Sequence, residues 1–491
     1  MNKYVLSIDA GTTGITVLLL TKVGNVIDKE YSEFKQYYPK PGWVEHDPME
    51  IWNTTLNLIK VVLKKYSADS IDSIGITNQR ETTVIWNKNS GKPIYNAIVW
   101  QCRRTSKYCE KLKLDGYSEL FQEKTGLVID SYFSGTKINW ILDNIEGARS
   151  QAESDILLFG TIDTWLIWNL SKGKCHVTDY TNASRTLIYN IDKKYWDIEL
   201  LSILNIPKNI LPNVKSSSTV YCHTDVSITE QNIPISGIAG DQQAALFGQN
   251  CYEENSVKIT YGTGCFLLIN TGKNRLKSNS GMLTTLACDK KGNPVYAIEG
   301  SVFIGGAVIQ WIRDELQLIN NAQETEKISF SINDTGGVYI VPAFSGLGSP
   351  YWDMDARGLI SGITRGTNRS HIVRASLESI AYQVKDILDV IKTDLNAPIT
   401  ELKVDGGATM NQFLMQFQTD IIGININKPE NIETTATGAG FLAGLATGFW
   451  QNSSELISAR KVQNIYSPEM DEDKRKALWN GWKKAIKRTL R

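Results

Sequence analysis

The same pattern of a strand, a Gly/Thr turn and a second strand occurs twice in this chain of 491 residues. It reads YVLSIDAGTTGITVLLL over residues 4–20 and VKITYGTGCFLLI over residues 257–269. A further extended run follows each copy, the first after Gly24 and the second at residues 295–298, so each copy predicts a meandering sheet. Two halves that open alike predict two similarly built domains.

Helices are expected after both sets of strands. Apolar residues at helical spacing predict them at residues 48–65, 308–318, 372–391 and 411–422. Strand clusters followed by helices indicate α/β layers. At ~100–200 residues per domain the length allows two to four domains. We predict two, residues 1–250 and 251–491, facing one cleft. Because no Ser/Gly-rich linker stands out, the join is expected to be a buried crossover near residues 245–256.

The composition excludes several classes of protein. Lys and Arg number 52, as do Asp and Glu, so no net charge draws the chain to nucleic acid or an anionic bilayer. No stretch approaches the ~18 apolar residues of a membrane span, and the apolar run before Asp9 is too short for a secretory signal, which favours a cytoplasmic protein. The 7 cysteines form no C-x-x-C pair and the 4 histidines are scattered, so we expect reduced thiols and no zinc site. The basic segment 471–491, with Trp479 and Trp482, predicts an amphipathic helix packed on the body.

Two turns are candidates for holding phosphate. In the first turn a strand delivers Asp9 into a tight bend whose backbone N–H groups and the hydroxyls of Thr12 and Thr13 can face an anion. Asp9 could also hold Mg²⁺, directly or through water. The second turn, residues 262–264, offers similar donors from the other half. Two such turns across a cleft would clamp a triphosphate, whereas the alternative interpretation is two ordinary hairpin turns.

Two glycine clusters invite a nucleotide interpretation, and no P-loop motif is present. Residues 405–408 end a strand and open a helix near Asn411, where free N–H groups and the positive helix end could meet adenosine. The alternative is tight packing of a helix on a sheet. Residues 438–443 match G-x-G-x-x-A but follow no obvious strand, so a close-packed helix of small residues is favoured there.

Three further features suggest a polyol site with a base. Asp241 ends a predicted strand beside the cleft, where a carboxylate suits a general base, although a lone Asp is often a helix cap. Arg80 and Glu81 would suit a neutral polyol, because one donates and the other accepts, but a solvated surface ion pair is the alternative. In a regular strand they would point to opposite faces, so joint contact with one ligand demands a loop or bulge. Trp100 and Tyr132 could pack on the carbon chain of a polyol or belong to the core.

Several long phrases, taken in order, resemble the FGGY family of carbohydrate kinases, and within it the members that act on glycerol. The resemblance runs nearly end to end and includes the family's two diagnostic regions, at residues 132–144 and 358–378. The other phrases lie at residues 38–49, 75–82, 96–104, 238–248, 261–266 and 341–352.

The resemblance implies an α/β fold of two actin-like (RNase H-like) domains flanking a deep catalytic cleft, and ATP-dependent phosphorylation of glycerol to sn-glycerol 3-phosphate. It places the polyol and phosphate sites in the first domain and the nucleotide site in the second, with a homodimer or homotetramer expected. By position, the glycerol pocket would comprise Arg80, Glu81, Trp100, Tyr132, Asp241, Gln242 and Phe266, with Asp241 as the base. The phosphates would lie at Thr12 and Thr13, ADP or ATP at Thr263, Gly306, Gln310, Gly407 and Asn411, and Mg²⁺ near Asp9 and Asp241.

The sequence departs from this family pattern at two places. Thr16 stands where bacterial relatives often carry an Arg, so Mg²⁺ or another side chain would have to supply the positive charge for the nucleotide phosphates. Residues 227–232 lack the glycines and the Arg with which some relatives bind the inhibitor fructose 1,6-bisphosphate, and they include Glu230. We expect weak or absent inhibition by that bisphosphate. Two other functions stay open: a kinase of another polyol or a ketose such as xylulose, and a non-catalytic ATP-binding sensor or scaffold.

Overall fold

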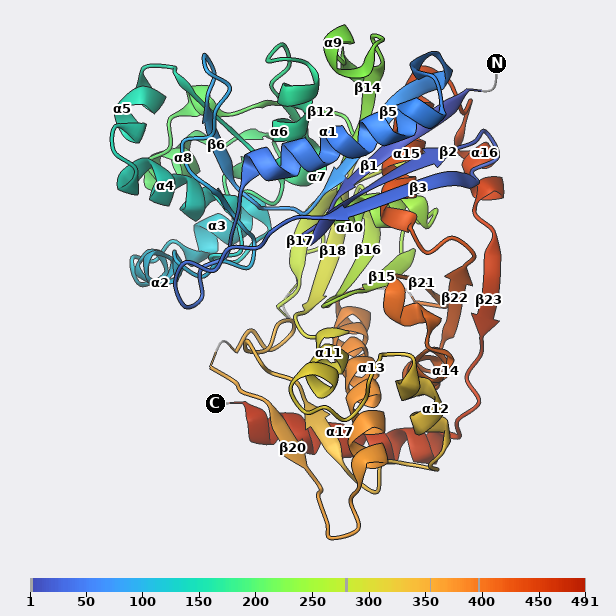
Figure 1. Cartoon of the computed structure of the whole chain (residues 1–491). Coiled ribbons are helices and arrows are strands. Elements are labelled where there is room, and N and C mark those ends of the chain that lie inside the picture. Colours follow the sequence, from blue (N-terminus) through green and yellow to red (C-terminus); the bar gives the residue numbers. More distant parts are fainter. Residues whose placement is uncertain (1–2, 279–280, 354, 396–397, 491) are drawn as a thin grey trace.

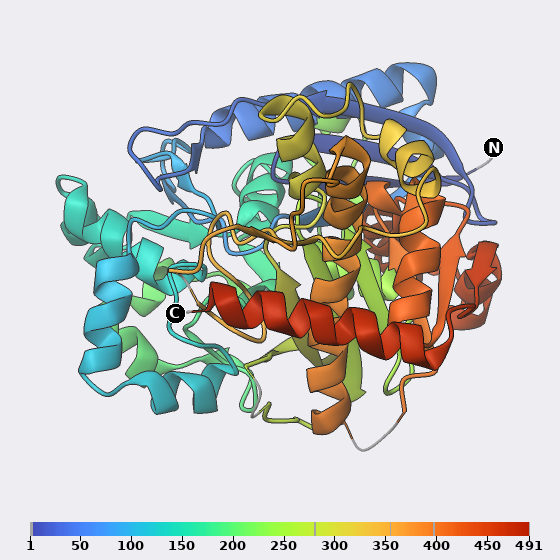
Figure 2. The ribbon, with the colours of Figure 1, turned by 90° about the horizontal axis from the view of Figure 1, so that it is seen from below.

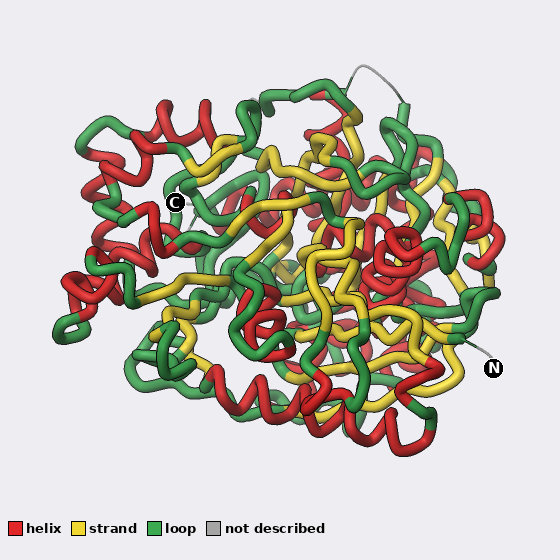
Figure 3. The backbone as a smooth tube through the Cα atoms, turned by 90° about the horizontal axis from the view of Figure 1, so that it is seen from above, coloured by secondary structure: helices red, strands yellow, loops and turns green. Residues whose placement is uncertain are grey.

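The computed structural model describes residues 3–278, 281–353, 355–395 and 398–490 (Figure 1). Two lobes, each built around one large sheet, lie one above the other in Figure 1. The N-terminal lobe contains the first sheet and the C-terminal lobe the second. Figure 3 shows strands running through the interior of the molecule and helices around them.

The first sheet has six strands in the order β13-β14-β5-β1-β2-β3. Strands β1, β2 and β3, the first three in the chain, form an antiparallel meander. Strands β5 and β14 extend the sheet in parallel on the other side of β1. The bounds are β1 Tyr4–Ala10, β2 Gly14–Leu20, β3 Val26–Glu33, β5 Ile71–Asn78, β13 Ser218–His223 and β14 Pro234–Gly240. The predicted meander at the start of the chain is confirmed.

The second sheet repeats this arrangement, in the order β17-β18-β16-β15-β21-β22-β23. An antiparallel meander of β15, β16 and β18 is extended in parallel by β21 and β22. The bounds are β15 Val257–Tyr261, β16 Cys265–Gly272, β17 Leu283–Cys288, β18 Pro294–Val302, β21 Glu401–Asp405, β22 Asn425–Pro429 and β23 Val462–Tyr466. The expectation of two halves that open alike is confirmed; β17 was not foreseen.

The four predicted helices all form, with small changes at their ends. Residues 48–65 are helix α1 (Pro48–Lys65), which begins after Asp47 because that carboxylate accepts from the backbone of Met49. The others are α11 (Ala307–Asp314), α13 (Arg369–Asp394) and α14 (Gln412–Ile422). In each lobe one long helix, α1 or α13, precedes the first parallel strand, so the helices repeat along with the sheets.

Helix α10 (Asp241–Gly248) of the N-terminal lobe and helix α15 (Thr434–Thr447) of the C-terminal lobe pack closely against each other. The contact requires glycine, because a Cβ on Gly438 would lie 1.9 Å from the carbonyl oxygen of Ala244. The G-x-G-x-x-A segment is therefore a close-packed helix of small residues, as expected. Because α15 also packs against β1, β5 and β14, the C-terminal lobe contributes a helix to the face of the first sheet.

The remaining elements surround these two sheets. In the N-terminal lobe they are β4 Glu45–His46, β6 Val84–Asn87, β7 Ala97–Ile98, α2 Ser106–Leu114, α3 Ser118–Thr125, α4 Ser134–Asn144, α5 Ala148–Glu153, β8 Leu157–Gly160, α6 Ile162–Leu170, β9 Val177–Asp179, α7 Tyr180–Ala183, β10 Tyr189–Asn190, β11 Tyr195–Trp196, α8 Ile198–Ile203, β12 Asn213–Lys215 and α9 Val226–Thr229. In the C-terminal lobe they are α12 Glu324–Phe330, β19 Tyr339–Val341, β20 Leu359–Ser361, α16 Ser453–Ala459 and α17 Glu472–Thr489.

Helix α17 lies across the C-terminal lobe, as Figure 2 shows in red. Trp482 is fully buried, stacks on Tyr382 at 5.2 Å and donates from Nε1 to Asp386 at 2.7 Å. The predicted amphipathic helix packed on the body is confirmed. Across the described ranges, no helix combines the length and apolar character that crossing a membrane would need.

Candidate functional site

Arg80 and Glu81 lie in the loop that follows β5, and both side chains are buried. Glu81 has a φ of 60°, which turns its side chain out of the strand alternation, so Arg80 Nε lies 3.9 Å from Glu81 Oε1. The geometric demand for a loop or bulge at this point is met. The alternative of a solvated surface pair is wrong, because each residue is at most 2% exposed.

Two further charged residues complete a buried cluster with this pair. Arg185, which follows α7, donates from Nε to Glu81 Oε1 at 2.6 Å and from Nη2 to Glu299 Oε1 at 3.0 Å. Arg80 donates to both oxygens of Glu299, from Nη1 at 2.5 Å and from Nη2 at 3.1 Å. Neither Arg185 nor Glu299 is among the residues predicted from the sequence. A signal existed for Glu299, because it is the one charged residue in the buried strand β18.

The charges in this cluster control one another's ionisation. Burial alone would raise the pKa of Glu299, but Arg185 and Arg80 together lower it to about 2. Burial also raises the pKa of Glu81, against the pull of Arg185 and Arg80. Glu299 is therefore the firmly ionised carboxylate of the cluster.

An aromatic wall stands beside the charged pair. The ring of Trp100 lies 5.6 Å from that of Tyr132 and 6.3 Å from that of Phe266, all edge to face. Trp100 is half-buried and donates from Nε1 to Thr12 Oγ1 at 2.9 Å. The wall thus joins residues of both lobes and touches the first Gly/Thr turn, whereas Tyr132 is also part of the core at 4% exposure.

Asp241 is the first residue of α10 and keeps 29% of its side chain exposed. Its Oδ1 lies 3.1 Å from Arg80 Nε, so it borders the charged cluster. Gly240 occupies the N-cap position, and Asp241 Oδ1 accepts from the backbone N–H of Gln242 in the first turn at 2.7 Å. The neighbouring Gln242 is buried and accepts from Lys258 Nζ at 2.5 Å. Lys258, a buried lysine in β15, is a further charged residue that the sequence analysis did not single out.

Asp9 lies at the end region of β1, next to the first Gly/Thr turn, and is half-buried. Burial raises its pKa to about 8, helped by Asp241 and Glu433 and opposed by Lys29. Among the described residues, no hydrogen-bond or ion-pair partner is recorded for its carboxylate. Asp9 and Asp241 are therefore two carboxyl groups close enough to influence each other's charge, and Asp241 is paired with Arg80.

The five residues predicted to bind nucleotide line one cavity of about 570 Å³ in the C-terminal lobe: Thr263, Gly306, Gln310, Gly407 and Asn411. Apolar side chains such as Ile309, Leu377, Ile380 and Leu414 form much of its wall. Its size and character match the usual small-molecule site.

The glycine cluster at the edge of this cavity combines one tightly packed glycine with one that borders the open space. Gly406 has a φ of +89°, and a Cβ there would lie 2.5 Å from the carbonyl oxygen of Tyr261, so it is required for packing. Gly407 has open space around it and faces the cavity. Asn411 caps α14 through Leu414 N at 2.9 Å, and its Nδ2 donates to Thr325 at 3.0 Å.

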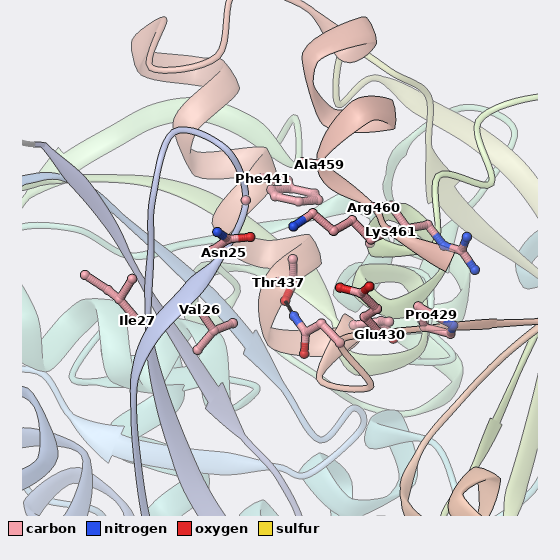
Figure 4. A pocket seen from close by; sticks show the side chains of 14 residues that line it. Asn25, Val26, Ile27, Pro429, Glu430, Thr437, Phe441, Ala459, Arg460 and Lys461 are labelled. Atoms are coloured by element: carbon pink, nitrogen blue, oxygen red, sulfur yellow. Dashed lines mark hydrogen bonds between the residues drawn. The ribbon is translucent and has the colours of Figure 1, made fainter. Parts of the chain in front are cut away.

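A second cavity, of about 430 Å³, lies between the lobes and contains none of the predicted site residues (Figure 4). The β2–β3 turn, α15 and residues 459–461 line it, and Asn25, Glu430 and Lys461 lie around it. Within the described ranges, no group of three or more His, Cys, Asp and Glu side chains could hold a metal ion by itself.

Comparisons with known proteins give a consistent family. The FGGY family of carbohydrate kinases matches through its N-terminal domain at residues 4–248 and its C-terminal domain at residues 257–447. The glycerol kinase of Thermoanaerobacter pseudethanolicus is 57% identical, with 100% of this chain and 99% of the relative covered. The crystal structure of Plasmodium falciparum glycerol kinase with ADP has a TM-score of 0.92 at 39% identity, covering 100% of this chain and 99% of that chain. Ligand-bound xylulose kinase from Lactobacillus acidophilus has a TM-score of 0.88 at 22% identity, covering 99% and 97%, which shows a shared fold only.

Proposed function

The chain belongs to the FGGY family of carbohydrate kinases, and we propose that it transfers the γ-phosphoryl group of ATP to glycerol, giving sn-glycerol 3-phosphate. The observation that carries the proposal is the charged cluster beside an aromatic wall, with Asp241 at its edge. A small, neutral, hydroxyl-rich molecule suits such a pocket. Relatives named glycerol kinase over the full length of the chain support the same acceptor.

Glycerol lies, in this proposal, between the charged pair and the aromatic wall. Arg80 donates to its hydroxyls and Glu81 accepts from them, while Trp100 and Phe266 pack against the carbon chain. Tyr132 and Gln242 complete the pocket. Because Trp100 also bonds to Thr12, the acceptor would lie next to the turn that holds phosphate.

The nucleotide occupies the 570 Å³ cavity, where apolar side chains receive the adenine and ribose. Gly306, Gln310, Gly407 and Asn411 bind this part of the nucleotide. The polyphosphate extends toward Thr263 of one turn and Thr12 and Thr13 of the other, whose N–H and hydroxyl groups donate to its oxygens.

Asp241 acts as the base of the reaction. Its partly exposed carboxylate accepts the proton of a terminal glycerol hydroxyl as the oxygen attacks the γ-phosphorus in line with the leaving ADP. Most of the acceleration comes from positioning and from donors aimed at the transferring group.

Asp9 and Asp241 fit a divalent cation, because both are carboxylates and Asp9 has no partner among the described residues. Mg²⁺ held there with the phosphates would neutralise the charge that develops on the transferring oxygens. It would also supply the positive charge that Thr16 does not. A cytoplasmic homodimer or homotetramer stays a prediction.

The test is calorimetric titration of glycerol with and without a non-hydrolysable ATP analogue, followed by an assay of ADP release across glycerol, xylulose and other small polyols. The proposal predicts glycerol binding and ADP release that depends on glycerol. Faster turnover of a ketose would favour the other kinase, and nucleotide binding without any acceptor-dependent release would favour the sensor or scaffold.

A further inference from the structure

Glu299 belongs to the C-terminal lobe but lies beneath the polyol pocket of the N-terminal lobe. It is fully buried on β18, opposite Leu268 of β16 and Leu283 of β17. The β17–β18 hairpin is fastened to the N-terminal lobe: Leu286 N donates to Ser184 Oγ at 3.2 Å, and Leu283 and Leu286 join a core cluster of that lobe. Glu299 is therefore held in place from both lobes.

Glu299 fixes the orientation of two arginines at once. It accepts from both terminal nitrogens of Arg80, Gln243 Oε1 accepts from Arg80 Nη1 at 3.2 Å, and Arg80 Nε lies 3.1 Å from Asp241. The second N–H of Nη2 is left to donate to a ligand. Glu299 also accepts from Nη2 of Arg185, whose Nε then meets Glu81. Arg185 Nη1 is buried without a hydrogen-bond partner among the described residues, so Glu299 and Glu81 are the carboxylates that hold this guanidinium.

The four buried charges of this cluster cancel. Arg80 and Arg185 carry two positive charges, Glu81 and Glu299 two negative ones, and all four residues are at most 2% exposed. Without Glu299 these residues would carry an excess positive charge, and Arg80 would be held by Asp241 and by Gln243, which accepts from its Nη1 at 3.2 Å.

We propose that Glu299 is a positioning and specificity-determining residue of the polyol pocket: it aims Arg80 and Arg185 at the pocket carboxylates and balances their charge so that the pocket selects a neutral acceptor. This inference rests on the proposed function. It assigns to a residue of the opposite lobe the preference for glycerol over an anionic three-carbon analogue such as D-glycerate.

The size of the effect follows from Coulomb's law. One guanidinium, with a hydrogen bond on each side, separates the Glu299 carboxylate from a bound ligand by about 8 Å. At an effective dielectric constant of about 20, removing one unit charge at that distance changes the affinity for an anion by about 30-fold. Glu299→Gln should therefore strengthen D-glycerate binding relative to glycerol. The ratio of the glycerol KM to the D-glycerate inhibition constant should rise about 30-fold. The substitution should also raise the glycerol KM at least tenfold while the ATP KM stays within about twofold.

The experiment measures both constants in the full-length enzyme, with circular dichroism to verify folding. Asp386→Asn is the matched control, because it removes another buried carboxylate of the C-terminal lobe, one that accepts from Trp482 and Lys483 of α17 and not from the pocket arginines. It should leave the ratio unchanged. Arg185→Gln removes a positive charge and should shift the ratio the other way, which provides a test even if Glu299→Gln does not fold. The double variant should return the ratio to near the wild-type value.

A purely structural role for Glu299 would weaken both ligands alike and leave the ratio unchanged. A ratio within threefold of wild type in folded Glu299→Gln, or shifts of the same sign in Glu299→Gln and Arg185→Gln, would overturn the inference. Wild-type enzyme that neither binds nor phosphorylates glycerol would instead overturn the proposed function itself.

Discussion

Replacing Asp9 with asparagine should stabilise the protein at alkaline pH while abolishing most of its activity. Burial and the neighbouring Asp241 and Glu433 raise the pKa of Asp9 to about 8, compared with about 3.9 in an unfolded chain. Between these two values the folded protein holds a proton that the unfolded chain has lost. Its stability should therefore fall as the pH rises from about 4 to about 8. Asparagine resembles the protonated acid and is free of this penalty.

The magnitude can be worked from that shift. About four pKa units at ~1.4 kcal/mol each gives an upper limit of about 6 kcal/mol. Because the carboxylate is half-buried and water screens it, about 1–2 kcal/mol at pH 8 is the reasonable expectation. For domains of roughly this size, at about 2–4 °C per kcal/mol, that gain raises Tm by about 2–8 °C.

The assay is differential scanning fluorimetry from pH 5 to pH 8.5 in the absence of nucleotide and Mg²⁺. The Tm difference between Asp9→Asn and wild type should grow with pH, and Mg²⁺ with ATP should close it by stabilising the wild type alone. Asp115→Asn, an exposed residue at the end of α2, is the control and should show no such trend. A variant that is less stable than wild type at pH 8 would refute the reasoning.

Three other predictions concern separate parts of the molecule. Asp241→Asn should lower kcat by about a thousandfold or more while calorimetry shows glycerol and ATP binding within severalfold of wild type; an unchanged kcat would dismiss Asp241 as the base. Gly438→Ala should destabilise the protein by about 3 kcal/mol, because its Cβ would lie 1.9 Å from the Ala244 carbonyl oxygen, and a urea titration in which the unfolding midpoint does not move would contradict this contact. Fructose 1,6-bisphosphate at submillimolar concentration should leave the steady-state rate unchanged. Clear inhibition would mean that residues 227–232 bind it without an arginine.

Local patterns in the sequence were sufficient to predict much of the fold. The repeated strand–turn–strand opening, the helix at residues 48–65 and the amphipathic helix at the carboxyl end all form. Strand β17 was not foreseen, because the sequence pattern does not reveal that this strand pairs with β18 and also packs against the other lobe.

The candidate site likewise contains residues that the sequence predicted and residues that it did not. The five nucleotide-site residues line one cavity, and Arg80 and Glu81 lie side by side as one shared ligand would require, although their roles stay proposals. Arg185 and Glu299 were missed because they are 114 residues apart in sequence and meet only when the lobes come together. A charged residue within an apolar strand, as at Glu299 and Lys258, is the sequence signal that could have drawn attention to them.

The most direct test of the central claim is the identity and amount of the product formed from ATP, Mg²⁺ and glycerol. One sn-glycerol 3-phosphate is expected for each ADP released, with both absent when glycerol is omitted and both formed at least about a thousandfold more slowly in Asp241→Asn. ADP release at the same rate without glycerol, or a phosphorylated product only from a ketose, would contradict that claim.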